Sequence, residues 1–160
     1  MPDRASMTIP PRPAPREPLA DEALIQLLAI AIHHISGRLT AAQLQGMRHS
    51  VEQACLVPRH IEWDRRATAH AEIFGLLADA AGHWPLARVL RSGAGFAHHL
   101  MVTAGPAAGM MTANSRHRLL AFLSADDAEG AAQEMERHLR VLRFMGRIAK
   151  TGTRVRRCAR

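Results

Sequence analysis

Residues 23–35, "ALIQLLAIAIHHI", form the longest apolar run of this 160-residue chain. On a helix these apolar side chains surround the whole circumference, which predicts a central, buried helix from Asp21 to Ser36 that ends at Gly37. The run is shorter than the roughly 18 residues that a membrane span needs, and it carries Gln26. Because the N-terminus also lacks the apolar core of a signal peptide, we expect a soluble, cytoplasmic protein with no membrane contact.

Helix signals continue along the rest of the chain. Thr40 and Gln43 have the spacing of a capping box, and Pro58 stops the helix that they begin. Later helices are expected over residues 62–81, 85–104, 111–124 and 128–149, with Asp126 or Asp127 capping the last one. Strand-like alternation and internal repeats are absent from the sequence. The predicted fold is all-α, a single antiparallel bundle of about six helices.

Two glycines inside one expected helix weaken this helical pattern. Gly93 and Gly95 lie inside the helix expected over residues 85–104, and each glycine costs about 1 kcal/mol relative to alanine in a helix interior. The sequence therefore predicts a kink or a break lining a pocket at this point.

Charge divides the chain into three parts. Residues 1–18 hold six of the nine prolines and indicate a disordered, proline-rich leader, whereas residues 19–150 form the helical domain. Residues 19–146 carry twelve arginines against twelve acids, so the domain is close to neutral. The excess positive charge lies at the C-terminus, in a basic tail over residues 151–160 and just before it; the basic residues are Arg147, Lys150, Arg154, Arg156, Arg157 and Arg160. Such a segment attracts nucleic acid or an anionic surface without specificity, or serves only solubility.

Ten histidines raise the question of a metal site. Two ligands on one helix face need a spacing of three or four residues, and no histidine pair here has it. The pairs His33/His34 and His98/His99 are adjacent, so their side chains diverge by about 100° and cannot chelate one ion from a helix. We expect each pair to contribute one surface and one partly buried imidazole.

A more specific signal comes from two long stretches. "HAEIFGLLADAAGHWPLARVL" (70–90), followed by "SRHRLLAFLSADDAEGAAQEMERHLRVL" (115–142), resembles the C-terminal effector-binding (FCD) domain of GntR-family transcription regulators of the FadR type. The most specific part is the closing D-x-x-x-A-x-x-x-M-x-x-H-L pattern, from Asp127 to Leu139. The resemblance covers roughly residues 20–148 and implies an FCD-like helical domain that senses a ligand and forms a homodimer.

The resemblance also implies a pocket. Metal-binding members of that family hold a divalent ion with one aspartate and three histidines, and these positions fall here on His70, Phe74, Arg116 and His138. Only His70 and His138 keep ligand-type side chains, so a zinc or nickel site would need His117 as a third ligand. A guanidinium binds carboxylates directly. We therefore expect Arg116 to replace the metal as the anchor for a small organic acid, with His70, Phe74 and His138 as pocket walls.

No winged helix-turn-helix fits in the proline-rich leader, so the expected function is that of the sensing and dimerising half of a regulator. DNA would then be reached only through a separate or missing helix-turn-helix. Two alternatives stay open: a small helical protein that binds nucleic acid or an anionic surface through its basic tail, and a helical metalloprotein. No enzyme is expected, because none of the serines lies in a nucleophile motif and Cys55 has no motif around it.

Overall fold

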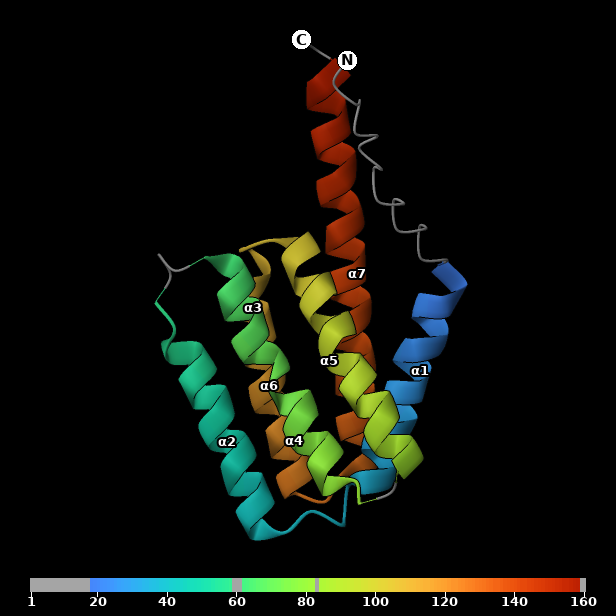
Figure 1. Ribbon diagram of the computed structural model, residues 1–160, viewed down its shortest axis with the longest axis vertical. Helices are drawn as coiled ribbons and strands as arrows, with labels where there is room; N and C mark the ends of the chain where they lie inside the picture. Colours follow the sequence, from blue (N-terminus) through green and yellow to red (C-terminus); the bar gives the residue numbers. More distant parts are fainter. Residues whose placement is uncertain (1–17, 59–61, 83, 159–160) are drawn as a thin grey trace, which may run out of the picture.

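The computed structural model describes residues 18–58, 62–82 and 84–158, and these residues form helices and no strand. The helices are α1 (Pro18–Ile35), α2 (Ala41–Leu56), α3 (Trp63–Ala71), α4 (Ile73–Ala80), α5 (Trp84–Ala104), α6 (Ala108–Ser124) and α7 (Ala128–Cys158). Successive helices run up and down the molecule, with α3 and α4 sharing one direction (Figure 1). The predicted all-α antiparallel bundle is therefore confirmed. Except for Pro18, which begins α1, the leader expected over residues 1–18 lies outside the described residues.

The helix ends follow local capping signals. Gly37 follows α1 with a φ of +72°, a left-handed conformation that glycine adopts without a steric penalty. At the start of α2 the backbone N–H of Gln43 donates to Thr40 Oγ1 over 3.2 Å, and the N–H of Thr40 donates to Gln43 Oε1 over 2.8 Å. Asp127 caps α7 by accepting the N–H of Gly130 at 2.8 Å. The predicted capping box and final cap are both present.

The single helix expected over residues 62–81 is interrupted once, between α3 and α4. At this point the N–H of Glu72 bonds to the carbonyl of Ala69, and the N–H of Gly75 bonds to the carbonyl of Glu72, each only three residues earlier in the chain. These tighter bonds shift the register of the helix without reversing its direction. The interruption matters for the site, because His70 lies just before it and Phe74 just after it.

The break predicted at Gly93 and Gly95 is absent, and α5 runs continuously through both residues. A side chain at Gly93 would place its Cβ 2.5 Å from Cδ2 of Leu28 and 2.9 Å from Cδ1 of Phe74. Glycine is therefore needed at this position because α5 passes close to α1 and α4. Its lower helix propensity is offset by the tighter packing that it permits.

Helix α1 is not the central helix that its sequence predicted. It lies at the edge of the bundle, where it packs against α7, α5 and α4 (Figure 1). Leu27 is 48% exposed and Ile30 is 60% exposed, and the side chains of His33 and His34 are also exposed. The buried side of α1 is a stripe at helical spacing, made of Ile25, Leu28, Ile32 and Ile35. One apolar face of α1 is thus left uncovered by the described residues.

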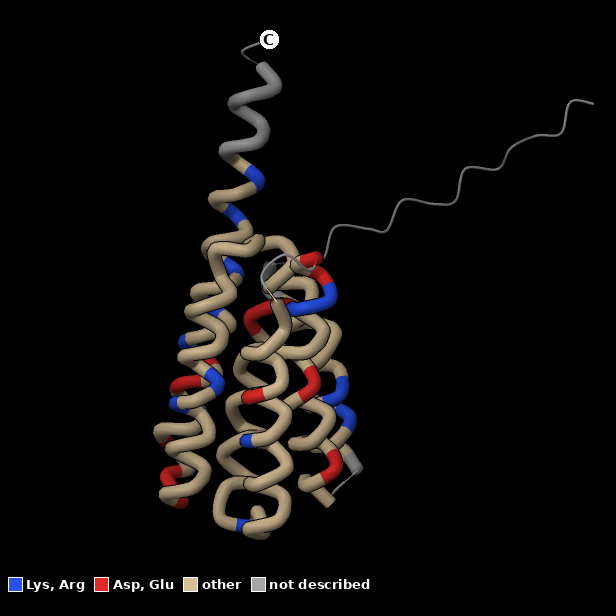
Figure 2. Tube along the Cα trace, turned by 90° about the vertical axis from the view of Figure 1, so that its left-hand side faces the viewer, with Lys and Arg blue, Asp and Glu red and all other residues tan. Residues whose placement is uncertain are grey.

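Helix α7 holds the bundle together, since it packs against α1, α5 and α6. Its inner face buries Met135, Leu139 and Leu142 completely. The C-terminal turns of α7 extend beyond the ends of the other helices (Figure 1). Basic residues lie where α7 leaves the bundle (Figure 2), and the sequence adds Arg154, Arg156 and Arg157 in the turns that follow. Among the described helices, none is long and apolar enough to cross a membrane.

Candidate functional site

Four residues that the resemblance places in one pocket come together inside the bundle. His70 of α3, Phe74 of α4, Arg116 of α6 and His138 of α7 are 3%, 0%, 1% and 2% exposed. The Arg116 Nε–H donates to the backbone carbonyl of His70 over 3.3 Å, and the guanidinium carbon lies 5.1 Å from the centre of the Phe74 ring. We call these four residues together with Met135 the Arg116 cluster.

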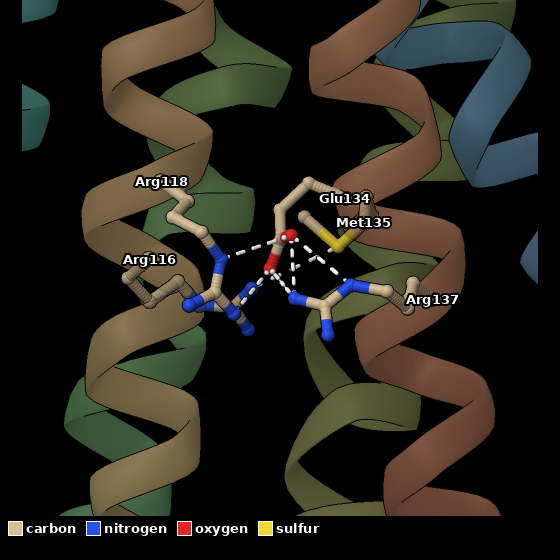
Figure 3. A network of polar contacts seen from close by, with 5 residues as sticks. All are labelled: Arg116, Arg118, Glu134, Met135 and Arg137. Atoms are coloured by element: carbon tan, nitrogen blue, oxygen red, sulfur yellow. Dashed lines mark hydrogen bonds and ion pairs between the residues drawn. The ribbon is translucent and has the colours of Figure 1, made fainter.

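Arg116 is the largest fully buried side chain of the described residues. Its Nη1 lies 3.7 Å from the sulfur of Met135, and a thioether sulfur is only a weak acceptor (Figure 3). Its Nη2 has no hydrogen-bond partner. No carboxylate of the described residues lies within 4.0 Å of the guanidinium. Burial lowers the pKa of Arg116 to about 10, partly opposed by the charge of Glu134. The side chain therefore stays charged at neutral pH and lacks a direct counter-ion.

The nearest acid, Glu134, is already engaged by two other arginines. Arg118 of α6 donates to it at 3.0 and 3.1 Å, and Arg137 of α7 donates to it at 2.6 to 3.2 Å (Figure 3). Burial raises the pKa of the Glu134 carboxyl, but the hydrogen bonds from Arg118 and Arg137 outweigh it and the net pKa is lowered. These three residues, the Glu134 network, join α6 to α7 and leave Arg116 without a carboxylate of its own.

The two histidines of the Arg116 cluster are neutral at physiological pH. Burial, with smaller contributions from the charges of Arg116, Arg66 and His117, lowers the pKa of His70 to about 4. Burial also lowers the pKa of His138 well below its usual range, again with a contribution from Arg116. The Nδ1 of His70 and the Nε2 of His138 are shielded from solvent and have no partner. Each neutral ring keeps one N–H donor and one acceptor nitrogen for hydrogen bonding.

A cavity of about 470 Å³ opens from the surface next to His70. It lies between the end of α2, the helix α3 and the first turns of α6, and it is lined by Cys55, Arg66, His70 and positions between Pro106 and Ala113. None of the described residues that line it is acidic. His70 is shared by this cavity, which we call the α6 cavity, and by the Arg116 cluster. The other three predicted pocket residues lie in the core and do not line it.

His117 does not join His70 and His138 in a metal site. Its side chain is exposed on α6, and its Nε2 lies 3.9 Å from the sulfur of Cys55. Adjacent helical residues point about 100° apart, so the burial of Arg116 turns His117 outward. Within the described residues, no three histidine, cysteine, aspartate or glutamate side chains are placed to hold one metal ion. The proposed rescue of the metal site by His117 is therefore not supported by the geometry.

Of the two adjacent histidine pairs, His98/His99 has the predicted arrangement of one partly buried and one surface imidazole, whereas His33/His34 does not. His98 is half-buried, with its Nε2 3.1 Å from Asp64 Oδ1, while His99 is exposed. In the other pair both His33 and His34 are exposed. Neither pair contributes to the Arg116 cluster.

The basic C-terminal segment continues α7 and does not form a separate extension. Arg147 and Lys150 are exposed on this helix, and α7 runs on to Cys158 through the positions of Arg154, Arg156 and Arg157. Arg160 lies outside the described residues. The predicted tail of residues 151–160 is thus helical over most of its length, with no acidic residue in its sequence.

Sequence reasoning missed the roles of four residues of this site. Glu134 and Arg137 are three residues apart on α7, a spacing that favours a helical ion pair and could have identified them. Arg66 of the α6 cavity carries no comparable sequence signal, because its role depends on how separate helices pack. Met135 stands at the methionine of the D-x-x-x-A-x-x-x-M-x-x-H-L pattern, but the pattern does not predict its contact with Arg116.

Comparison with known proteins found no matching family model, curated protein or solved structure. The resemblance to the FCD domain therefore stays a prediction based on the motifs of residues 70–90 and 115–142.

Proposed function

We propose that this chain is a ligand-sensing and dimerising domain of the GntR regulator type and that it binds a small organic acid at Arg116. The observation that carries the proposal is the burial of a charged arginine without a carboxylate partner, next to two neutral histidines with unpaired nitrogens. Burying a charge or a polar group without a partner costs several kcal/mol. A bound carboxylate would supply the missing partner.

The chemistry of the Arg116 cluster suits a carboxylate better than a neutral or cationic ligand. The unpaired Nη2 of Arg116 donates a charge-assisted hydrogen bond, which is stronger than a bond between neutral groups. Each neutral imidazole of His70 and His138 adds one N–H donor. The Phe74 ring and the Met135 thioether exclude water from one side, which strengthens the attraction between the two charges.

The α6 cavity supplies a route to this cluster. His70 lines the cavity, and its backbone carbonyl accepts the hydrogen bond from Arg116. A ligand that enters the cavity therefore meets His70 first and reaches Arg116 by a local rearrangement of α3 and α6. Such a coupled movement is what a sensing domain needs, because ligand binding then shifts the positions of helices.

The dimerising part of the proposal rests on α1. Leu27 and Ile30 lie three residues apart on its outer face and are about half exposed, so they form an apolar surface that a second copy could cover.

A thermal-shift titration with small linear carboxylates tests the proposed ligand class. Binding to the folded state raises the free energy of unfolding by about 2.7 kcal/mol at a hundredfold excess over Kd. For a domain of this size this corresponds to an increase in Tm of about 5–10 °C. We expect the wild type to show this increase and the Arg116→Met variant to lose it, since methionine fills a similar space without charge.

The matched control is Arg118→Gln, on the same helix two residues away and half exposed. This variant should keep the acid-dependent increase in Tm. Stabilisation that persists in Arg116→Met, or no stabilisation of the wild type by any carboxylate, would contradict the proposal.

A further inference from the structure

The α6 cavity holds a second arginine in a fixed position. The guanidinium carbon of Arg66 lies 5.3 Å from the centre of the Trp63 ring, and Trp63 is itself held by a 2.8 Å hydrogen bond from its indole N–H to the carbonyl of Met101. A Cβ added at Gly109 would lie only 3.4 Å from Nη2 of Arg66. The side chain of Arg66 is thus placed against the first turn of α6.

The charge of Arg66 is also uncompensated. Its Nε is shielded from solvent and has no hydrogen-bond partner, and none of the ion pairs among the described residues involves it. The described residues that line the cavity include no acid. The N-terminus of α6 adds partial positive charge here through the helix dipole, since the N-cap residue Ala107 and Gly109 line the cavity.

His70 is the independent sign that the cavity is built for a ligand. Only 3% of its surface is exposed, it lines the cavity, and its Nδ1 has no hydrogen-bond partner. Besides burial, the charges of both Arg116 and Arg66 lower the pKa of His70. The imidazole is therefore close enough to interact electrostatically with two arginines that have no carboxylate partner, one in the core and one in the cavity.

We infer that the ligand is a small dicarboxylic acid, with one carboxylate paired to Arg116 and the other to Arg66 at the N-terminus of α6. The inference rests on the proposed function for the first carboxylate and adds the second site. The carbon chain of the ligand would pass His70, which lies between the Arg116 cluster and the α6 cavity. Arg66 thereby sets the specificity for two carboxylates over one.

Titration calorimetry with matched acids tests this inference on the full chain. The probes are succinate, glutarate and adipate, each compared with the monocarboxylate of equal carbon number: butyrate, valerate and hexanoate. A charged hydrogen-bonded pair formed by the second carboxylate predicts that the best dicarboxylate binds about tenfold more tightly than its monocarboxylate. The Arg66→Gln variant should abolish this ratio and leave the affinity for the monocarboxylate unchanged.

Arg65→Gln is the matched control, since Arg65 precedes Arg66 on α3 but is exposed. It should keep the tenfold preference. Arg116-dependent binding of monocarboxylates without any preference for dicarboxylates would overturn this inference and leave the proposed function intact. A preference that survives Arg66→Gln would also overturn it. If no acid binds the wild type, or if binding is indifferent to Arg116→Met, the proposed function and this inference both fail.

Discussion

Two arginine-containing clusters lie between α6 and α7, and they differ in how completely their polar groups are paired. In the Glu134 network one carboxylate accepts hydrogen bonds from Arg118 and Arg137, both of which also reach solvent. In the Arg116 cluster the arginine is fully buried, one of its terminal nitrogens is unpaired, and two histidine nitrogens nearby are unpaired as well. The same residue type therefore has two roles on one helix.

This difference separates stability from function. In the Glu134 network each charged side chain has an ion-pair partner, so we interpret its role as holding α6 and α7 together. We expect the Arg116 cluster to lower the stability of the domain, because a buried charge without a partner is costly. Under the proposed function, a bound carboxylate would pair with these unpaired groups. Three predictions test this contrast.

The largest effect is expected from acid. The pKa of His70 falls to about 4 in the folded state and that of His138 is also lowered, whereas both lie near 6.5 in the unfolded chain. Below pH 6.5 the unfolded chain therefore binds protons that the folded protein does not, so the free energy of unfolding falls as pH falls. The expected loss is about 1.4 kcal/mol per pH unit for each histidine. Urea unfolding between about pH 7.5 and 5 measures it.

The double variant His70→Gln with His138→Gln should flatten this slope. A control with the exposed residues His34→Gln and His49→Gln removes the same number of imidazoles and should keep it. Glu22 and Glu134 do not interfere, because their lowered pKa values lie below 4.5. An equal slope in the two double variants would mean that the buried histidines are not the acid-sensitive groups.

The second effect is expected at Glu134. The Glu134→Gln substitution removes the charge that Arg118 and Arg137 share, and this charge also stabilises the charged form of Arg116. The free energy of unfolding should fall by about 2 kcal/mol at neutral pH, as is typical for a largely buried charged hydrogen-bond acceptor. Chemical denaturation at fixed pH provides the measurement.

Glu22 offers a surface counterpart for comparison. It also bridges two arginines, Arg140 at 2.6 Å and Arg143 at 2.5 Å, but it is 31% exposed. Exposed ion pairs contribute little to stability, so Glu22→Gln should cost clearly less than Glu134→Gln. Equal losses in the two variants would show that burial does not distinguish the Glu134 network.

The fold could be predicted from sequence to the extent that its signals are local. The capping box of Thr40 and Gln43, the cap at Asp127 and the stop at Gly37 act over a few residues, and all of them are present. The position of α1 at the edge and the continuity of α5 through Gly93 could not be predicted in this way. Both depend on which helices pack against which faces, and a single helix pattern does not contain that information.

The candidate site divides in the same way. The resemblance to the FCD domain selected His70, Phe74, Arg116 and His138, and these residues lie together in the core. Whether Arg116 or its neighbour His117 faces inward could not be decided from sequence, because a rotation of about 100° exchanges them. Arg66 could not be found at all, since its position depends on the approach of α3 to the first turn of α6.

The third prediction has the smallest effect and the opposite sign. Replacing the buried, unpaired Arg116 by methionine removes a desolvated charge and leaves an apolar side chain against Phe74 and Met135. Such replacements are neutral or stabilising in other cores. The lost hydrogen bond to the carbonyl of His70 offsets part of the gain. We expect the free energy of unfolding of Arg116→Met to rise by about 1 kcal/mol in the absence of ligand, measured by denaturation.

Arg91→Met is the control for this gain, because Arg91 is 60% exposed on α5 and its replacement should change stability by less than about 0.5 kcal/mol. A loss of stability in Arg116→Met comparable to that in Glu134→Gln would remove the contrast between the two clusters, since Arg116 would then be a structural residue. A gain combined with the loss of acid binding has only one physical reading: the domain gives up stability at Arg116 in order to hold an anion there.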